Sequence, residues 1–329
     1  MTQIRPMLAA QKYREAGDLW GELHLKVVQR HLDEDGFLYG QPKWDGMRAI
    51  LWDGEAKSRS WKPLANQALQ CFAQDHPELK GLDCEVFSGH SYAPSSFRES
   101  MSGVRSHDGS GVLTLVYFDH ILQAAQFYHH RMQYAADVVT DIYQEYVGNE
   151  YHIIAMQCPT KQLRTLEDIF AYEEECIAKG FEGAIVRRPY KPYKYNRATA
   201  LGGELIKVKR RDYVDAIVEG VEQRYENQNE AKISELGYTT RSSSKEGKVP
   251  IDMLGALHIR ILNGPLAGTV QKCGVFRGLT HDDLRSLWIN QDTDPIEGRY
   301  CEVSVDKATG GYESGRCAVW IRWRAREEF

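Results

Sequence analysis

The apolar residues of this 329-residue chain come in short runs of strand length. The longest run, residues 112–118, contains Thr114 and ends at Asp119. A helix that crosses a bilayer needs about 20 consecutive apolar residues, so no membrane span is expected. Hydrophobic residues make up 42% of the chain and charged residues 26%, which is enough apolar material for a buried core and argues against a disordered or fibrous protein.

The N-terminus and the cysteines indicate in which cellular compartment the protein is located. The first six residues lack the apolar core of a secretion signal. The seven cysteines are scattered, odd in number and never spaced as C-x-x-C. Neither a disulfide framework nor a zinc cage is therefore expected, and the sequence predicts a reducing, cytoplasmic location.

The length of the chain and a change in its character predict two domains. A typical domain has about 100–150 residues, so this chain has the length of two. Helical and strand-like patterns are mixed up to about residue 210. Beyond it the chain contains short strand-like runs and one helix, residues 280–290, with Thr280 as its cap. This pattern is typical of a small OB-type β-barrel, and we expect domains at residues 1–212 and 213–329.

Local signals predict individual elements. Asp53-Gly54 between two apolar runs predicts a β-hairpin. Asn66 is expected to cap a short helix, and Thr165 is expected to begin a second one with a capping box. The polar segment 223–248 has no periodic pattern, and we interpret it as a long loop.

The net charge of −5 hides a concentration of cations. Residues 187–211 contain nine Lys and Arg and a single acid, Glu204, which leaves −13 for the rest of the chain. Such a basic strip can bind phosphates even when the total charge is negative. A solvated, lysine-rich loop is the alternative interpretation of the strip taken alone.

The sharpest motif is at residues 43–48, which read Lys-Trp-Asp-Gly-Met-Arg, a K-x-D-G-x-R. A lysine on a strand edge can attack phosphorus as a neutral amine. Arg48, five residues further on, can hydrogen-bond a ribose or phosphate oxygen. The alternative is an Asp-Gly turn with incidental charges.

The hexapeptide resembles the first motif of the covalent nucleotidyltransferases, a superfamily of polynucleotide ligases and mRNA-capping guanylyltransferases. The later motifs of that superfamily follow in the correct order, at residues 82–86 (LDCEV), 116–119 (VYFD), 182–187 (EGAIVR) and 205–210 (LIKVKR). Five ordered matches are far harder to obtain by chance than any one of them. Within the superfamily, the chain is most similar to the small ATP-dependent DNA ligases of bacteriophages, from about residue 42 to the C-terminus.

The resemblance implies an α+β fold, with a nucleotidyltransferase (adenylation) domain of antiparallel sheets and flanking helices followed by a small OB-fold β-barrel that binds DNA. It implies an ATP-dependent DNA ligase that seals 5′-phosphate/3′-hydroxyl nicks in duplex DNA through a lysyl-AMP intermediate and a DNA-adenylate. DNA replication, repair and recombination are the expected processes. ATP and Mg²⁺ (or Mn²⁺) are the expected cofactors and nicked duplex DNA the expected partner. A monomer in the cytoplasm is expected, in the host cytoplasm if the chain is phage-encoded.

The motif matches also imply the roles of individual residues. The catalytic residues are expected to be Lys43, Asp45, Lys207 and Lys209. The ATP-binding residues are expected to be Gln41, Pro42, Lys43, Arg48, Glu85, Phe118, Lys207 and Lys209. Glu182 is expected to support the metal. Arg59 is expected to bind the 5′-phosphate of the nick, with Lys62 as the alternate.

The chain departs from the family pattern at one motif, and two alternative functions remain. Many family members carry R-x-D-K near the C-terminus, where residues 324–327 here read Arg-Ala-Arg-Glu, which counts against a capping enzyme. An RNA ligase or a capping guanylyltransferase would use the same lysine chemistry. A non-catalytic nucleic-acid-binding protein would need only the basic strip. A hydrolase is poorly supported, because G-x-S-x-G, H-E-x-x-H and Walker-type motifs are absent from the sequence.

Overall fold

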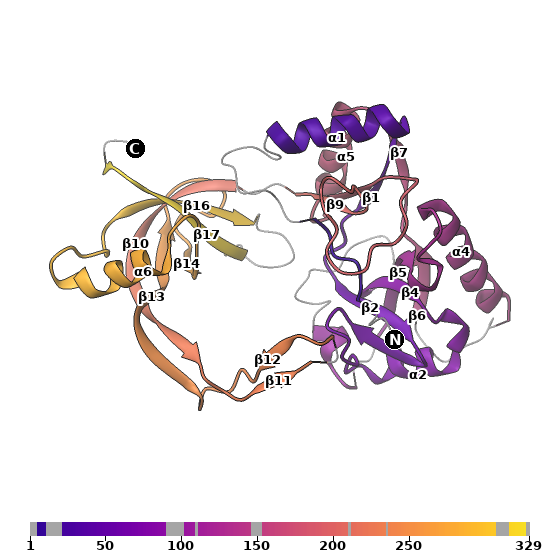
Figure 1. Cartoon of the computed structure of the whole chain (residues 1–329), viewed down its shortest axis with the longest axis horizontal. Helices are drawn as coiled ribbons and strands as arrows, with labels where there is room; N and C mark the ends of the chain where they lie inside the picture. Colours follow the sequence, from indigo (N-terminus) through magenta and orange to yellow (C-terminus); the bar gives the residue numbers. More distant parts are fainter. Residues whose placement is uncertain are drawn as a thin grey trace. The chain divides into compact units, whose positions relative to one another are not determined.

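The computed structural model describes residues 5–10, 22–89, 102–108, 111–145, 153–209, 212–234, 236–306 and 316–326 (Figure 1). The chain divides into two compact units, Met1–Lys209 and Arg210–Phe329. Both units combine sheets with helices, which confirms the α+β class. Within the described ranges, every helix is too short or too polar to cross a membrane.

The first unit contains a five-stranded sheet with the order β3-β2-β4-β5-β6. Its strands are β2 (Met47–Trp52), β3 (Glu55–Ser58), β4 (Leu82–Ser88), β5 (Leu113–His120) and β6 (Ile153–Gln157). All neighbours are antiparallel except β5 and β6. Asp53 and Gly54, with φ of 51° and 75°, connect β2 to β3, which confirms the predicted hairpin.

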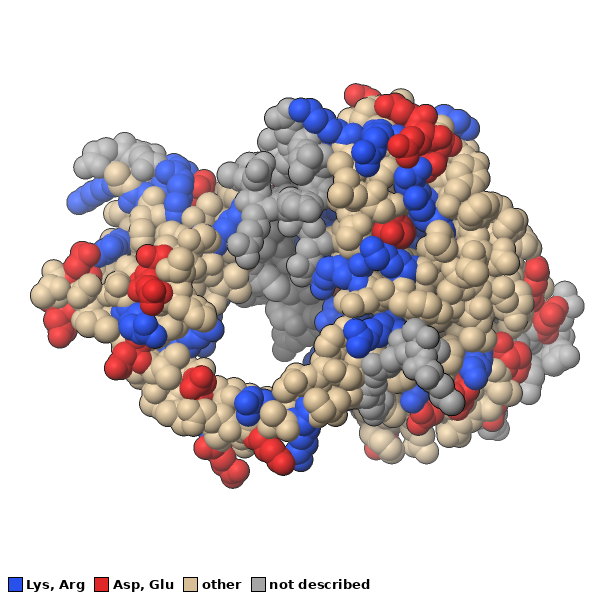
Figure 2. Space-filling model, viewed as in Figure 1, with Lys and Arg blue, Asp and Glu red and all other residues tan. Residues whose placement is uncertain are grey.

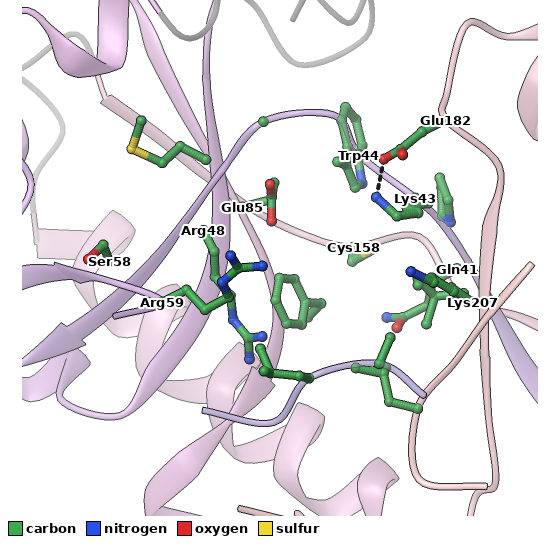
Figure 3. A pocket seen from close by; sticks show the side chains of 18 of the residues that line it. Gln41, Lys43, Trp44, Arg48, Ser58, Arg59, Glu85, Cys158, Glu182 and Lys207 are labelled. Carbon is green, nitrogen blue, oxygen red and sulfur yellow. Dashed lines mark hydrogen bonds and ion pairs between the residues drawn. The ribbon is translucent and has the colours of Figure 1, made fainter. Parts of the chain in front are cut away.

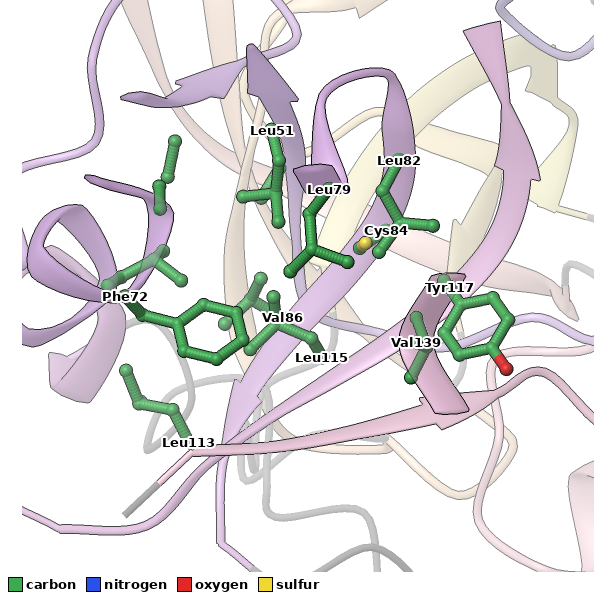
Figure 4. Close-up of a cluster of buried hydrophobic side chains, with 14 of the residues drawn as sticks. Leu51, Phe72, Leu79, Leu82, Cys84, Val86, Leu113, Leu115, Tyr117 and Val139 are labelled. Carbon is green, nitrogen blue, oxygen red and sulfur yellow. The ribbon is translucent and has the colours of Figure 1, made fainter. Parts of the chain in front are cut away.

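Two helices, α2 (Gln67–Asp75) and α4 (Tyr128–Glu145), cover one face of this sheet. Figure 4 shows the core between them, in which Phe72 of α2 lies near Leu51 and Val86 of the sheet. The Asn66 side chain accepts a hydrogen bond from the backbone N–H of Leu69 at 3.0 Å. The predicted cap is therefore confirmed, and it fixes where α2 begins.

A second sheet in the first unit has the order β7-β1-β8-β9, with all neighbours antiparallel. Its strands are β1 (Leu38–Pro42), β7 (Lys161–Leu163), β8 (Ala184–Arg187) and β9 (Ile206–Val208). Helices α1 (Glu22–Asp35) and α5 (Leu166–Ala178) pack against it around a shared apolar cluster. Thr165 and Asp168 form the capping box that the sequence predicts at the start of α5.

Residues 43–46 carry the chain from β1 in the four-stranded sheet to β2 in the five-stranded sheet. This connection passes close to β4. A Cβ at Gly46 would lie 2.6 Å from the carbonyl oxygen of Val86, a distance that no side chain tolerates. The glycine of the K-x-D-G-x-R motif is therefore required by the close approach of two backbones.

The second unit contains a six-stranded sheet with the order β14-β13-β10-β16-β17-β15. The strands are β10 (Asp212–Asn227), β13 (Lys248–Ile261), β14 (Val270–Cys273), β15 (Val275–Phe276), β16 (Tyr300–Asp306) and β17 (Arg316–Arg324). Helix α6 (His281–Ile289) begins with a capping box formed by Thr280 and Asp283, which confirms the predicted cap. The two outermost strands, β14 and β15, are separated only by Gly274. No ladder joins them into a closed barrel within the described residues.

The interpretation of residues 223–248 as a long loop is wrong. Strand β10 continues through this segment and pairs with β13 as far as the Asn227–Lys248 pair. Two further strands, β11 (Ala231–Ile233) and β12 (Thr239–Arg241), form a small hairpin beyond it. Most of these residues are exposed or only half-buried. A ribbon without a buried face has no alternation of apolar and polar residues, so its sequence resembles a loop.

Candidate active site

A cavity of about 800 Å³ in the first unit is lined by both sheets (Figure 3). Ten of the twelve predicted site residues line it: Gln41, Pro42, Lys43, Arg48, Arg59, Glu85, Phe118, Glu182, Lys207 and Lys209. Asp45 and Lys62 are not among the lining residues. The structure therefore brings together residues that the sequence spreads over more than 160 positions.

Three lining residues form a row across the four-stranded sheet. Gln41 on β1 lies opposite Ile185 on β8, and Ile185 lies opposite Lys207 on β9. Residues that are directly opposite in antiparallel strands extend from the same face of the sheet. The register therefore places an amide, an alkyl group and an ammonium group side by side on the wall of the cavity.

The backbone of Lys43 is fixed to the residues that precede β8. Its N–H donates to the carbonyl oxygen of Gly183 at 2.8 Å, and its carbonyl oxygen accepts from the N–H of Glu182 at 3.0 Å. Gly183 has a φ of 143°, and a Cβ there would lie 2.4 Å from the carbonyl oxygen of Val208. The close approach at Gly183 and the positive φ of that residue both require glycine, and they hold Lys43 beside Glu182. In the sequence this requirement is visible only as a glycine.

The Glu182 carboxylate lies between two ammonium groups. Its Oε2 accepts from Lys43 Nζ and its Oε1 accepts from Lys209 Nζ (Figure 3 shows the first contact as a dashed line). Burial favours the neutral acid, but Lys43 and Lys209 outweigh it and lower the pKa of Glu182 to about 2. The pKa of Lys207 is also lowered, first by burial and then by the charges of Lys43 and Lys209. Positive charge is therefore concentrated at this end of the cavity.

The opposite wall, on the five-stranded sheet, holds an arginine in a fixed orientation. Arg48 donates two hydrogen bonds to the buried carboxylate of Asp83, from Nε at 2.7 Å and from Nη2 at 2.5 Å. Its guanidinium carbon lies 5.4 Å from the ring centroid of Phe118. A bidentate pair of this kind leaves the guanidinium little rotational freedom.

A β-bulge occurs at Phe118. Cys84 of β4 pairs with Tyr117 and Asp83 pairs with Asp119, so Phe118 is an extra residue on β5. Bulges re-aim side chains and are frequent beside active sites. The Phe118 ring is half-buried and lines the cavity.

Glu85 lies on the same wall, opposite Arg48 in the β2–β4 register. Burial raises its pKa, and the charges of Lys43 and Arg48 offset that rise only in part, so that the pKa is about 7. A carboxyl group in this state changes its charge near neutral pH.

The two candidates for a DNA phosphate differ in position. Strand β3 ends at Ser58, so Arg59 lies in the turn that follows the hairpin. Arg59 is exposed and lines the cavity, whereas Lys62 is exposed outside the lining. Position therefore favours Arg59 over Lys62.

Part of the basic strip serves the fold. Arg187 is buried and donates to Asp119 at 2.7 Å, and Arg188 donates to Asp35 at 2.5 and 2.7 Å. Lys207 and Lys209 line the cavity instead. Figure 2 shows Lys and Arg side chains, in blue, gathered over part of the surface of the first unit. The two last cations of the strip, at positions 210 and 211, lie outside the described residues.

Several lining residues were not predicted. Leu8 and Cys158 carry no motif signal, because the segments around them are short and ordinary in composition. Arg105 also lines the cavity, and its sequence neighbourhood gives no sign of it. Trp44 is the variable position of the motif, but its ring stacks on Phe87 at a centroid distance of 4.9 Å and anchors the loop.

The carboxylates of the cavity provide a limited set of metal ligands. Among the described residues, no group of three or more His, Cys, Asp and Glu side chains could hold a metal ion. Glu85 and Glu182 both line the cavity. Mg²⁺ is usually held by one or two carboxylates together with substrate phosphates and water, and these two residues fit that requirement.

Comparison with known proteins relates the chain to DNA ligases by its fold. No protein-family model and no curated protein matches the sequence. A solved Lig E DNA ligase has a TM-score of 0.62 and 18% identity, with 97% of this chain and 99% of that chain covered. A Chlorella virus DNA ligase-adenylate has a TM-score of 0.50 and 19% identity, with 99% of each chain covered. The chain therefore has the fold of the DNA ligases, as its motifs predict.

Proposed function

We propose that the chain is an ATP-dependent DNA ligase that joins 5′-phosphate and 3′-hydroxyl ends at nicks in duplex DNA. The observation that carries the proposal is the placement of Lys43, which lines a cavity of nucleotide size together with Glu182, Lys207 and Lys209. The fold shared with DNA ligases supports the same conclusion. An aromatic ring, Phe118, lines the same cavity and suits a purine.

The first reaction is the transfer of AMP to the enzyme. Lys43 gives a proton to water, and its Nζ then attacks the α-phosphorus of ATP. A P–N bond forms, and the bond from the α-phosphorus to the bridging oxygen breaks, so that pyrophosphate leaves. Lys207 and Lys209 stabilise the charge on the α-phosphate, and Arg48 and Glu85 fix the ribose. Such transfers depend mainly on positioning and on electrostatic stabilisation. The Gln41 and Pro42 segment borders the base, and Asp45 orients the loop from outside the lining.

Two further transfers complete the joining reaction. AMP passes from Lys43 to the 5′-phosphate at the nick, which Arg59 binds. The adjacent 3′-hydroxyl then attacks that 5′-phosphate and releases AMP. Glu182 is the residue that would hold Mg²⁺, and a bound Mg²⁺ would offset the charge on the reacting phosphate oxygens.

The remaining assignments follow from the same proposal. The adenylation domain covers residues 1–212 and the OB-fold DNA-binding domain covers residues 213–329, which agrees with the division into two compact units. The protein acts as a monomer in the cytoplasm, in DNA replication, repair and recombination. Its binding to DNA weakens with salt, because the contacts are made to phosphates.

The decisive experiment is intact-mass measurement of the protein after incubation with the metal and a nucleotide. The sample is first treated with pyrophosphate to remove any AMP already attached, and ATP and GTP are then compared. A single AMP adduct from ATP, absent in Lys43→Ala and retained in Lys62→Ala, is the expected result. A GMP adduct would indicate a capping enzyme, and no adduct would indicate a binding protein. Sealing of nicked DNA against nicked RNA then distinguishes a DNA ligase from an RNA ligase.

A further inference from the structure

The side-chain amide of Gln41 is held by two hydroxyl groups. Its Nε2 donates to the hydroxyl of Tyr128 at 2.7 Å and to Oγ1 of Thr160 at 3.3 Å. Gln41 is 2% exposed and nevertheless lines the cavity. Both partners come from segments that carry none of the nucleotidyltransferase motifs, so no short sequence pattern identifies them.

The direction of these hydrogen bonds is set by a backbone carbonyl group. The hydroxyl of Thr160 donates to the carbonyl oxygen of Cys158 at 3.1 Å. A carbonyl oxygen can only accept, so the single proton of the Thr160 hydroxyl is used there and its oxygen is left to accept. The group of Gln41 that faces Thr160 must therefore be the NH₂ group and not the oxygen. The orientation of the amide thus follows from the chemistry of its partners.

Tyr128 is rigidly placed to receive the other amide hydrogen. It is the first residue of α4 and is 2% exposed. The guanidinium carbon of Arg187 lies 4.3 Å from its ring centroid, and Arg187 is itself held by Asp119 at 2.7 Å. Burial raises the pKa of Tyr128 well above its usual range, so its hydroxyl remains neutral. Both hydrogens of the Gln41 amide are thus occupied, and its oxygen is the group left to accept a hydrogen bond.

The two purines differ in what they present to such an acceptor. Adenine carries a 6-amino donor where guanine carries an oxygen acceptor. Ile185, Cys158 and Phe118 make the surroundings of Gln41 suitable for a base, whereas the charged residues suit phosphates. We propose that Thr160 and Tyr128 are positioning residues, which lock the Gln41 amide with its oxygen as the acceptor and thereby make the site select adenine over guanine. This proposal rests on the proposed nucleotidyl transfer.

The test compares adduct formation by variants of Thr160 with three nucleotides. Thr160 is exposed, so its replacement has little effect on packing. Thr160→Val keeps the shape but removes the hydroxyl, whereas Thr160→Ser restores it. Thr240→Val, in the exposed hairpin of the second unit, is the matched control. The rate of adduct formation is measured by intact mass with ATP, with GTP and with the ATP analogue that lacks the 6-amino group.

The wild type and the Thr160→Ser and Thr240→Val variants are expected to prefer ATP to both other nucleotides. Thr160→Val is expected to lower the ATP-to-GTP ratio and the ATP-to-analogue ratio by about 5- to 10-fold, the value of one hydrogen bond. Unchanged ratios in Thr160→Val, with adduct formation intact, would overturn the role of Thr160 and leave the proposed function standing. Equal use of ATP and GTP by the wild type would overturn it as well. A wild type that forms no adduct with any nucleotide would overturn the proposed function and this inference together.

Discussion

The two walls of the cavity each present a glutamate, and their surroundings drive the two carboxyl groups in opposite directions. Glu182, beside the four-stranded sheet, contacts Lys43 and Lys209 and has a pKa of about 2. Glu85, on the five-stranded sheet, has no ion pair within the described structure and a pKa of about 7. Burial disfavours the charged form of both groups. The difference between them therefore comes from direct contact with ammonium groups.

The difference in pKa suits the two glutamates to different chemical roles. A carboxylate that stays ionised at every physiological pH suits the binding of a cation or the alignment of a lysine. A carboxyl group that titrates near neutral pH can either donate or accept a hydrogen bond. Pairs of titratable groups with separated pKa values are typical of sites that handle charge during a reaction.

The largest effect is expected from removing one lysine of the charged wall. Lys209→Ala leaves Glu182 with a single ammonium partner and removes one positive charge from the proposed site of the α-phosphate. Adduct formation should fall about 100- to 1000-fold, as it does when one stabilising donor of a transition state is lost. Single-turnover intact mass measures the rate, and Lys62→Ala should retain the rate of the wild type. A folded Lys209→Ala variant with an undiminished rate would contradict a role for Lys209 in adduct formation.

The next effect concerns the backbone that supports the charged wall. Gly183→Ala forces a Cβ to within 2.4 Å of the Val208 carbonyl oxygen at a φ of 143°. The free energy of unfolding should fall by about 3 kcal/mol from overpacking and backbone strain combined. Chemical denaturation measures it. Gly274→Ala is the matched control, because the nearest atom there, the carbonyl oxygen of Gly255, lies at an ordinary 3.5 Å. Equal stabilities of the two variants would contradict the structural role of Gly183.

An effect of similar size, spread over the pH range, is expected from the titration of Glu85. Its pKa is raised from 4.5 to about 7, so between those pH values the folded protein binds more protons than the unfolded one. Stability from this group is fully present below about pH 4.5 and is lost as the pH rises through 7. The loss should be about 3 kcal/mol in the free energy of unfolding, and Glu85→Gln should remove this part of the pH dependence. Denaturation of both proteins between pH 4.5 and 8 measures it, and parallel profiles would show that Glu85 titrates normally.

Glu182 contributes in the opposite sense, at lower pH. Its folded pKa lies below its unfolded value of 4.5, so stability from this group is lost as the pH falls from 4.5 toward 2. The two glutamates therefore leave separate marks on a single pH profile.

The smallest effect is expected at the outer part of the cavity. Arg59→Ala should weaken binding of nicked duplex several-fold and lower the slope of log K against log salt by about one, because one phosphate contact is lost. Lys62→Ala should leave that slope unchanged, since Lys62 does not line the cavity. Binding titrations at four salt concentrations measure both variants. A lower slope in Lys62→Ala and an unchanged slope in Arg59→Ala would show that Lys62, and not Arg59, contacts the phosphate.

The sequence predicted those parts of the fold that depend on neighbouring residues. The Asp53-Gly54 turn and the caps at Asn66, Thr165 and Thr280 involve partners within a few positions, so short patterns reveal them. The ribbon at residues 223–248 was missed because its strands are exposed on both faces. Its pairing brings Asn227 opposite Lys248, and a pairing of that kind leaves no periodic trace in either strand.

In the candidate site, too, residues in short sequence patterns were predicted, whereas residues placed by distant contacts were not. Its motif residues were found because each belongs to a short ordered pattern, and the structure places most of them around one cavity. Cys158 and Leu8 were not found, because their role depends on where the sheets carry them. Thr160 is the clearest example, since its link to Gln41 spans 119 positions. Asp83 was within reach of prediction, as it is the second residue of the strand that carries Glu85.

The attachment of Lys43 to residues 182 and 183 has a consequence for the order of events during synthesis. The partner carboxylate lies 139 positions after the lysine. At about 5–20 residues per second, roughly 7–28 s separate their appearance on a ribosome. A nascent or truncated chain that ends before Glu182 has the lysine but lacks both the partner carboxylate and the ammonium groups of Lys207 and Lys209. Incomplete copies of this protein should therefore consume no ATP and trap no nucleotide, so only the completed first unit becomes chemically competent.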